Sequence, residues 1–125
     1  MTITVTPTSA RTASGLRAAL AVPAVHAEGT RTVVVLRGEA DLADRPVLAD
    51  VLSRVIALRA GDVVIDLTDA EFLDTAIVRA LAVGEQLLDR RGRRLTFRSP
   101  SRLAARVLDV FGLSDLIETE GFVQL

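Results

Sequence analysis

Two short, mainly apolar runs, each followed by a segment with helical spacing, constrain the fold of this chain more than any other feature. The runs cover residues 33–36 and 63–67, and runs of this kind are typical of strands buried on both faces of a sheet. Apolar residues then recur at helical spacing over 48–56 and again over 77–88. Strands that alternate with helices of this length predict βαβ units, so we expect an α/β fold.

Further elements are predicted on both sides of these units. Turn residues Glu28-Gly29 between the stretches 20–26 and 32–37 predict a hairpin, and a third short strand is expected at 95–97. The two later helices are expected to face inward with these residues: Ile77, Val78, Leu81, Leu87 and Leu88 in one, and Leu103, Val107, Leu108 and Phe111 in the other. The predicted architecture is a mixed, mostly parallel β-sheet with helices packed on it.

The length of the chain predicts a single domain. Its 125 residues are 50% hydrophobic, which is enough for one substantial core. We expect this domain to cover residues 18–125 and to end in a short helical turn and an edge strand. An N-terminal extension over residues 1–17, rich in Thr, Ser and Ala, precedes the domain and has no defined order in this prediction. The sequence does not define an oligomeric state.

Composition excludes several classes of function. The chain has no Lys and no Cys and only one His, so lysine chemistry, thiolate catalysis, disulfides and a Cys- or His-based metal site are ruled out. It also lacks the Gly-rich loops that bind nucleotides. A formal net charge of −1 disfavours direct nucleic-acid binding. We therefore expect a protein that is not an enzyme and holds neither cofactor nor metal.

The acid-free stretch 2–27 raises the question of export. Its apolar segment is interrupted by Pro23 and preceded closely by Arg17, and no charged region follows Met1, which disfavours a signal peptide. No apolar run approaches the roughly 20 residues of a membrane-spanning helix. We expect a cytoplasmic protein without membrane insertion.

The junction Asp74-Thr75-Ala76-Ile77 is the most informative local feature. It places a hydroxyl at the first turn of a predicted helix, where backbone N–H groups and the positive end of the helix dipole are exposed. Either Asp74 or Thr75 could cap the helix, and the sequence does not distinguish them. A phosphate on Thr75 would add about −1.5 to −2 charges at this point. The junction is therefore a candidate switch.

Two other groups of residues offer alternatives. The acid pairs Asp66 with Asp69 and Glu71 with Asp74 could support hydrolysis or hold Mg²⁺, although acids beside strand ends are more often solvated or capping groups. A cluster of arginines could form a nucleic-acid patch, but it lacks Tyr and Trp for stacking on bases. We interpret it as a solvated helix end. The cluster consists of Arg90, Arg91, Arg93 and Arg94.

These motifs, in this order, resemble the STAS domains of anti-sigma factor antagonists. The resemblance is carried by 37–41 (Arg-Gly-Glu-Ala-Asp), 64–67 (Val-Ile-Asp-Leu), 72–76 (Phe-Leu-Asp-Thr-Ala) and the segments 91–92, 99–101 and 107–113. It implies partner switching: an antagonist binds an anti-sigma factor and is released when that partner, a serine/threonine protein kinase, phosphorylates a hydroxyl. ATP and Mg²⁺ would then belong to the kinase.

The resemblance also implies roles for individual residues. Thr75 matches the phosphorylated position, and the implied partner-binding surface consists of Gly38, Asp41, Asp74, Thr75, Ala76 and Ile77. Ile77 stands where the family pattern has Gly, and it could either fill the core or add bulk where a kinase approaches. An alternative function is that of a STAS-like accessory subunit of a membrane lipid or anion transport assembly, which binds without being phosphorylated.

Overall fold

The computed structural model describes residues 23–40 and 44–119. The predicted extension 1–17 and the last six residues lie outside this part of the chain. The elements, in chain order, are β1 (Ala24–Glu28), β2 (Arg31–Ala40), α2 (Arg45–Leu58), β3 (Val63–Leu73), α3 (Thr75–Asp89), β4 (Leu95–Arg98), α4 (Arg102–Val110) and the short 3-10 helix η2 (Ser114–Leu116).

The strands form one sheet in the order β1-β2-β3-β4. β1 and β2 pair antiparallel, whereas β2 with β3 and β3 with β4 pair parallel. Beyond η2, Ile117 makes a parallel bridge to Phe97, so the chain adds one more contact to the β4 edge. The predicted mixed, mostly parallel sheet is confirmed.

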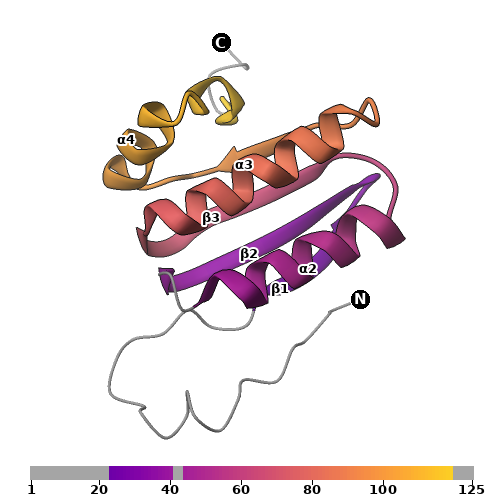
Figure 1. The fold of residues 1–125 in the computed structure, drawn as a ribbon, viewed down its shortest axis with the longest axis horizontal. Coiled ribbons are helices and arrows are strands. Elements are labelled where there is room, and N and C mark those ends of the chain that lie inside the picture. Colours follow the sequence, from indigo (N-terminus) through magenta and orange to yellow (C-terminus); the bar gives the residue numbers. More distant parts are fainter. Residues whose placement is uncertain (1–22, 41–43, 120–125) are drawn as a thin grey trace, which may run out of the picture.

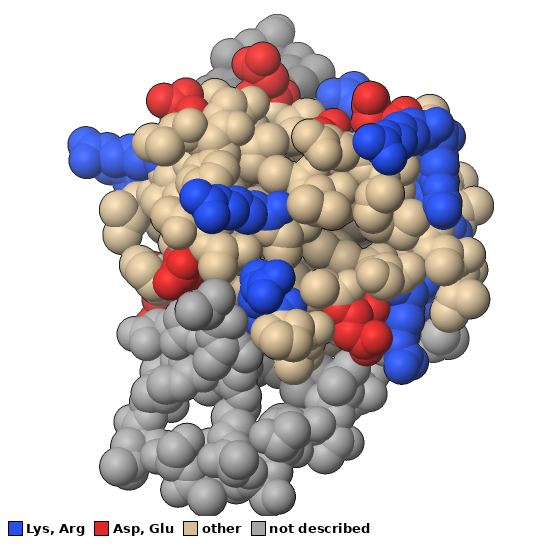
Figure 2. Space-filling view, in the orientation of Figure 1, with Lys and Arg blue, Asp and Glu red and all other residues tan. Residues whose placement is uncertain are grey.

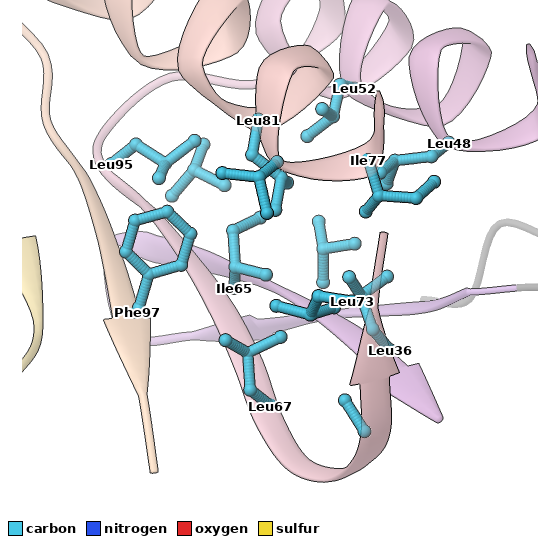
Figure 3. Close-up of a cluster of buried hydrophobic side chains, with 14 of the residues drawn as sticks. Leu36, Leu48, Leu52, Ile65, Leu67, Leu73, Ile77, Leu81, Leu95 and Phe97 are labelled. Atoms are coloured by element: carbon cyan, nitrogen blue, oxygen red, sulfur yellow. The ribbon is translucent and has the colours of Figure 1, made fainter. Parts of the chain in front are cut away.

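Helices α2 and α3 lie side by side over one face of the sheet, and α4 lies beyond β4 (Figure 1). Over the middle of this helix layer the outer surface carries few charged side chains (Figure 2). Beneath it, the side chains of both helices point toward those of the strands (Figure 3). Each fully buried aliphatic side chain contributes about 1.5–3 kcal/mol to folding, so this layer fixes both helices firmly on the sheet. The largest fully buried side chains include Leu36, Leu48, Ile65, Leu67, Ile77, Leu81 and Phe97.

β3 is longer than the sequence predicts. The expected acidic connection after Leu67 is strand as far as Leu73, so Asp69 and Glu71 lie within β3. Its register against β2 shifts twice, between Val35 and Arg37 and between Gly38 and Glu39, and the strand bends after Leu67 (Figure 3). Strand alternation is lost at such irregularities, which is why the pattern beyond Leu67 did not predict a strand.

Two leucines that were predicted to face inward are on the surface. Leu87 of α3 is 39% exposed and Leu103 of α4 is 54% exposed. In each helix the neighbouring position, Leu88 or Ala104, takes the place in the core. Helical periodicity identifies a stripe but not its edges, and these two residues lie just outside the buried part. The first strand also begins later than the predicted 20–26 and ends at Glu28.

The opposite face of the sheet has a much smaller apolar cluster. It consists of Val33, Val35 and Val64, with Ala24 packed against them. A network of ion pairs lies on the same face: Arg98 Nη2 is 2.7 Å from Glu28 Oε1 and Arg98 Nε is 3.1 Å from Glu118 Oε1. Since β1 and β4 are the two edges of the described sheet, the Arg98–Glu28 pair reaches across this face. Arg31 completes the network by pairing with both glutamates.

Candidate functional site

The carboxyl ends of β2 and β3 define the candidate site. Ala40, the last residue of β2, pairs with Leu73, the last residue of β3. The two strand ends therefore lie side by side, and the chain leaving β3 passes directly into α3. Ligands and partners of parallel α/β sheets usually bind at this edge. The Asp74-Thr75 junction is at that edge.

Asp74 caps α3. Its backbone is extended, with ψ 153°, and its side-chain Oδ1 accepts a hydrogen bond of 2.8 Å from the backbone N–H of Ala76. This is the usual geometry of an N-cap carboxylate, which satisfies a free donor and favours the positive end of the helix dipole. The structure thus answers the question that the sequence left open between Asp74 and Thr75.

Thr75 is the first residue of α3 and is exposed. Its Oγ1 lies 3.4 Å from Asp74 Oδ1, a long contact for a hydroxyl–carboxylate hydrogen bond. Because Asp74 supplies the cap, the Thr75 hydroxyl is not needed to cap the start of α3. It is an accessible hydroxyl oxygen beside an acid, at the positive end of the helix dipole.

Ile77 is fully buried, at 0% exposure, although it is only two residues from Thr75. Its side chain points into the core near Leu48 and Leu73 (Figure 3). Of the two interpretations of this residue, core filling agrees with the structure, and its bulk lies beneath the surface that a kinase would approach. Ile77 was predicted to contribute to the partner-binding surface. A side chain without exposed area cannot contact a partner, so Ile77 supports the site from below.

Gly38 has a structural reason to be glycine. Its φ of +78° is in the left-handed region, which side chains with a Cβ rarely adopt. It lies opposite Ala70 in the parallel register, between the two irregularities of the β2–β3 pair. It is thus part of the local distortion close to the end of both strands. Asp41, the other predicted residue of this strand end, lies outside the described residues.

Phe72 belongs to this edge and was missed in the sequence. It is one of only four aromatic residues of the chain, and 43% of it is exposed. Aromatic residues, Phe among them, are enriched at protein–protein interfaces relative to the rest of the surface. Its position two residues before Asp74 could have singled it out, but the predicted acidic connection gave no reason to decide which way its ring points.

The acidic residues of β3 do not converge on one point. Asp66 accepts hydrogen bonds of 2.9 and 2.6 Å from the backbone N–H and the hydroxyl of Thr68. Asp69 lies 3.7 Å from Arg37 on an exposed part of the sheet. Within residues 23–40 and 44–119 there is no group of three acids or histidines that could hold a metal. Asp66, Asp69 and Asp74 thus each make a separate, local contact.

Two arginines of the cluster contact the end of α2 and the turn that follows it. Arg93 donates hydrogen bonds of 2.7 Å to the Gly61 carbonyl and 2.9 Å to the Ile56 carbonyl, and Arg91 donates to the same Ile56 oxygen. Carbonyls at a helix C-terminus lack partners within the helix and attract cations. The interpretation as a solvated helix end does not hold for Arg93, which is partly buried against backbone of a neighbouring element. Arg90, Arg91 and Arg94 are exposed, as that interpretation expects.

Residues 24–118 match the family model of the Mlab, STAS domain. The match covers most of the chain, including every strand and helix described above. The chain therefore belongs to the STAS domain family. Among curated proteins, none matches this chain by sequence.

Solved anti-sigma factor antagonists share this fold. The chain is similar to the unphosphorylated form of the antagonist SpoIIAA, with a TM-score of 0.70 and 19% identity over 82% of this chain and 92% of that one. The phosphorylated form of SpoIIAA, the Bacillus cell fate determinant, has a TM-score of 0.65 and 18% identity over 82% of this chain and 96% of that one. An anti-sigma factor antagonist from Mycobacterium paratuberculosis has a TM-score of 0.71 and 22% identity over 81% of this chain and 87% of that one. At these identities the likeness establishes the fold.

None of the helices in the described part of the chain is long and apolar enough to cross a membrane.

Proposed function

We propose that this protein is a regulatory module of the anti-sigma factor antagonist type, which binds an anti-sigma factor with serine/threonine kinase activity through the N-terminal end of α3. The observation that carries the proposal is that Thr75 is exposed while Asp74 alone caps the helix. The contact surface would consist of Asp74, Thr75 and Ala76, together with Gly38 near the end of β2 and Asp41, which follows β2 in the sequence. Phe72 adds an exposed aromatic side chain beside it.

Phosphorylation of Thr75 would act as the release step. The γ-phosphoryl group of ATP is transferred to the Thr75 oxygen, ADP leaves, and the hydroxyl proton is taken up by the kinase. The product carries about −1.5 to −2 charges. The helix N-terminus favours this charge, but the carboxylate of Asp74 opposes it, and a partner surface that fits the bare hydroxyl loses both shape and charge complementarity. The cytoplasm, where sigma factors act, would be the place of this exchange.

The phosphorylation is tested by incubating the protein with its cognate kinase and ATP and mapping the phosphate by mass spectrometry. We expect one phosphate on Thr75, none on Thr75→Val, and unchanged modification of Thr68→Val. Thr68 is a matched control because it is also an exposed threonine of the same region, with its hydroxyl bound to Asp66. Modification elsewhere, or an unmodified Thr75, would contradict the proposal.

A second candidate function is that of an accessory subunit of a membrane lipid or anion transport assembly. One observation favours it: the family model that matches residues 24–118 is named Mlab, STAS domain. In this case the same surface would bind permanently, and Thr75→Glu would leave the interaction with the membrane-associated partner intact. Neighbouring genes also separate the candidates, because kinase and sigma factor genes favour the first and transporter genes the second.

A further inference from the structure

A groove runs between α2 and α3 on the outer face of the helix layer. It consists of two adjoining depressions of about 300 and 170 Å³, which share Arg45, Ala80 and Val83 as lining residues. Because Ala76 lines the first depression, the groove begins at the N-terminal end of α3. It then extends away from that end, toward Ile56 on one side and Leu87 on the other.

Small side chains on the two facing helices create the groove. Ala49 and Ser53 of α2 face Ala80 and Gly84 of α3, where longer side chains would close the space between the helices. The second depression is bordered by Val83 and Leu87, which are 55% and 39% exposed. Adjacent apolar side chains around a concave surface are typical of a binding site rather than of a solvated helix face.

The charges around the groove have one sign. Arg45 and Arg79 are the charged residues that line the two depressions, and no acidic residue lines either of them. Within the described part of the chain neither arginine forms an ion pair with an acid. Arg45 is the first residue of α2 and Arg79 lies one turn into α3, so both charges are at the same end of the groove as Thr75.

The groove has the length of a short helix. From Arg45 to Ile56 along α2, and from Ala76 to Leu87 along α3, the rise is about 16 Å, or roughly three helical turns. A segment that fits would need apolar side chains at helical spacing against Val83 and Leu87, and acidic side chains at the end that reaches Arg45 and Arg79. The stretch 2–27 of this chain contains no acidic residue and does not have this chemistry.

We propose that the α2–α3 groove binds an amphipathic helix of the partner protein, with acidic residues at the end that contacts Arg45 and Arg79. This proposal deepens the proposed function and rests on it for the identity of the partner. It does not require that Thr75 be phosphorylated. Apolar contacts in the groove would supply most of the affinity, while the two arginines would fix the direction of the bound helix.

A synthetic helical peptide of about four turns tests this inference. It carries glutamates in its first turn and leucines at i, i+4 and i+7, and its binding to the ¹⁵N-labelled protein is followed by NMR. We expect shifts concentrated at Ala80, Val83, Gly84 and Leu87, with affinity reduced at least about tenfold by Val83→Asp. Val110→Asp is the matched control, because Val110 is 81% exposed at the end of α4 and away from the groove. Its affinity should equal that of the wild type.

Charge reversal tests the direction of the bound helix. The double variant Arg45→Glu, Arg79→Glu should lose affinity for this peptide at least about tenfold, and a peptide with arginines in place of the glutamates should recover it. Absence of binding, shifts outside the groove, or equal affinity of the wild type and Val83→Asp would overturn the inference. If the peptide does not bind but Thr75 is phosphorylated normally, the groove proposal is overturned and the proposed function is not. If the peptide binds but Thr75 is not phosphorylated, only the proposed switch is contradicted.

Discussion

The two faces of the sheet are buried by different physical means. On one face, α2, α3 and α4 cover a large cluster of aliphatic side chains and Phe97. On the other face, three valines form the cluster, and an ion-pair network of Glu28, Arg31, Arg98 and Glu118 lies on the same side. The first face depends on packing and the second depends in part on charge. The candidate site belongs to the edge of the first face, where the core holds α3 in place while Thr75 at its start stays exposed.

This difference separates stability from function in α3. Ile77 and Leu81 anchor the helix from below, so changes in the exposed residues Thr75 and Val83 can alter binding with little effect on folding. The network on the opposite face instead links elements that are far apart in sequence: Glu28 in β1, Arg98 in β4 and Glu118 after η2. We expect the two faces to respond differently to substitution and to pH.

The largest effect is expected for Ile77→Ala. This variant removes buried methyl and methylene groups beneath the candidate site and should lower the free energy of unfolding by about 2–5 kcal/mol. Val83→Ala, an exposed position of the same helix, should change it by less than about 0.5 kcal/mol. Urea denaturation measures both. Equal effects of the two substitutions would show that Ile77 is not a core residue.

A smaller effect is expected for Arg98→Met on the opposite face. The side chains of Arg98 and Glu118 are only 15% and 11% exposed, so loss of the guanidinium leaves Glu28 and Glu118 with Arg31 in place of the two cations that they share. We expect a loss of about 1–3 kcal/mol. Arg54→Met is the control because its pair with Asp50 is exposed on α2, and it should lose less than about 1 kcal/mol. Equal losses of stability in the two variants would show that the ion pairs of Arg98 stabilise the fold no more than an exposed pair does.

At the edge between the two faces, Asp74→Ala should cost about 1 kcal/mol, because the carboxylate that accepts from Ala76 N–H is removed. Thr75→Val should change the free energy of unfolding by less than about 0.5 kcal/mol, since the hydroxyl does not cap the helix. Thermal and urea unfolding of both variants would check this order. The reverse order would assign the cap to Thr75 and weaken its role as a free hydroxyl.

Acid should affect the opposite face selectively. Hydrogen bonding from Arg98, followed by that from Arg31 and by the charges of both arginines, lowers the pKa of Glu28 from 4.5 to about 2, against the opposing effect of burial. A carboxylate with a lowered pKa in the folded state stabilises the protein above pH 4.5 and loses this contribution as the pH falls toward 2. The stability difference between the wild type and Glu28→Gln should therefore be constant above pH 4.5 and shrink below it. A difference that stays constant down to pH 2 would argue against the ion pairs.

The fold could be predicted from the sequence because its elements have clear periodicities. The buried run 33–36, the helical stripe 48–56 and the third strand at Leu95 all appear in the structure where the pattern predicts them. The extension of β3 to Leu73 could not be predicted, since the register shifts opposite Arg37 and Glu39 remove the alternation that identifies a strand.

The site was predicted in part. Its location at Asp74 and Thr75 followed from their place between a strand and a helix. Which of the two residues caps the helix could be decided only from the geometry of the cap. The ion-pair network escaped prediction because Arg98 and Glu28 are 70 residues apart in sequence. The groove could not be predicted either, because periodicity assigns Leu87 to the core and does not show which small residues of the neighbouring helix face it.

The most direct measurement of the central claim is the affinity of the cognate anti-sigma factor kinase for three forms of the protein: wild type, Thr75→Val and Thr75→Glu. Surface plasmon resonance with ADP-bound kinase would measure it, and circular dichroism would verify that all three are folded. The account predicts that Thr75→Val binds within about threefold of the wild type and that Thr75→Glu binds at least about tenfold more weakly, because only the glutamate places a new charge beside Asp74. Equal affinities of Thr75→Glu and the wild type would contradict the account.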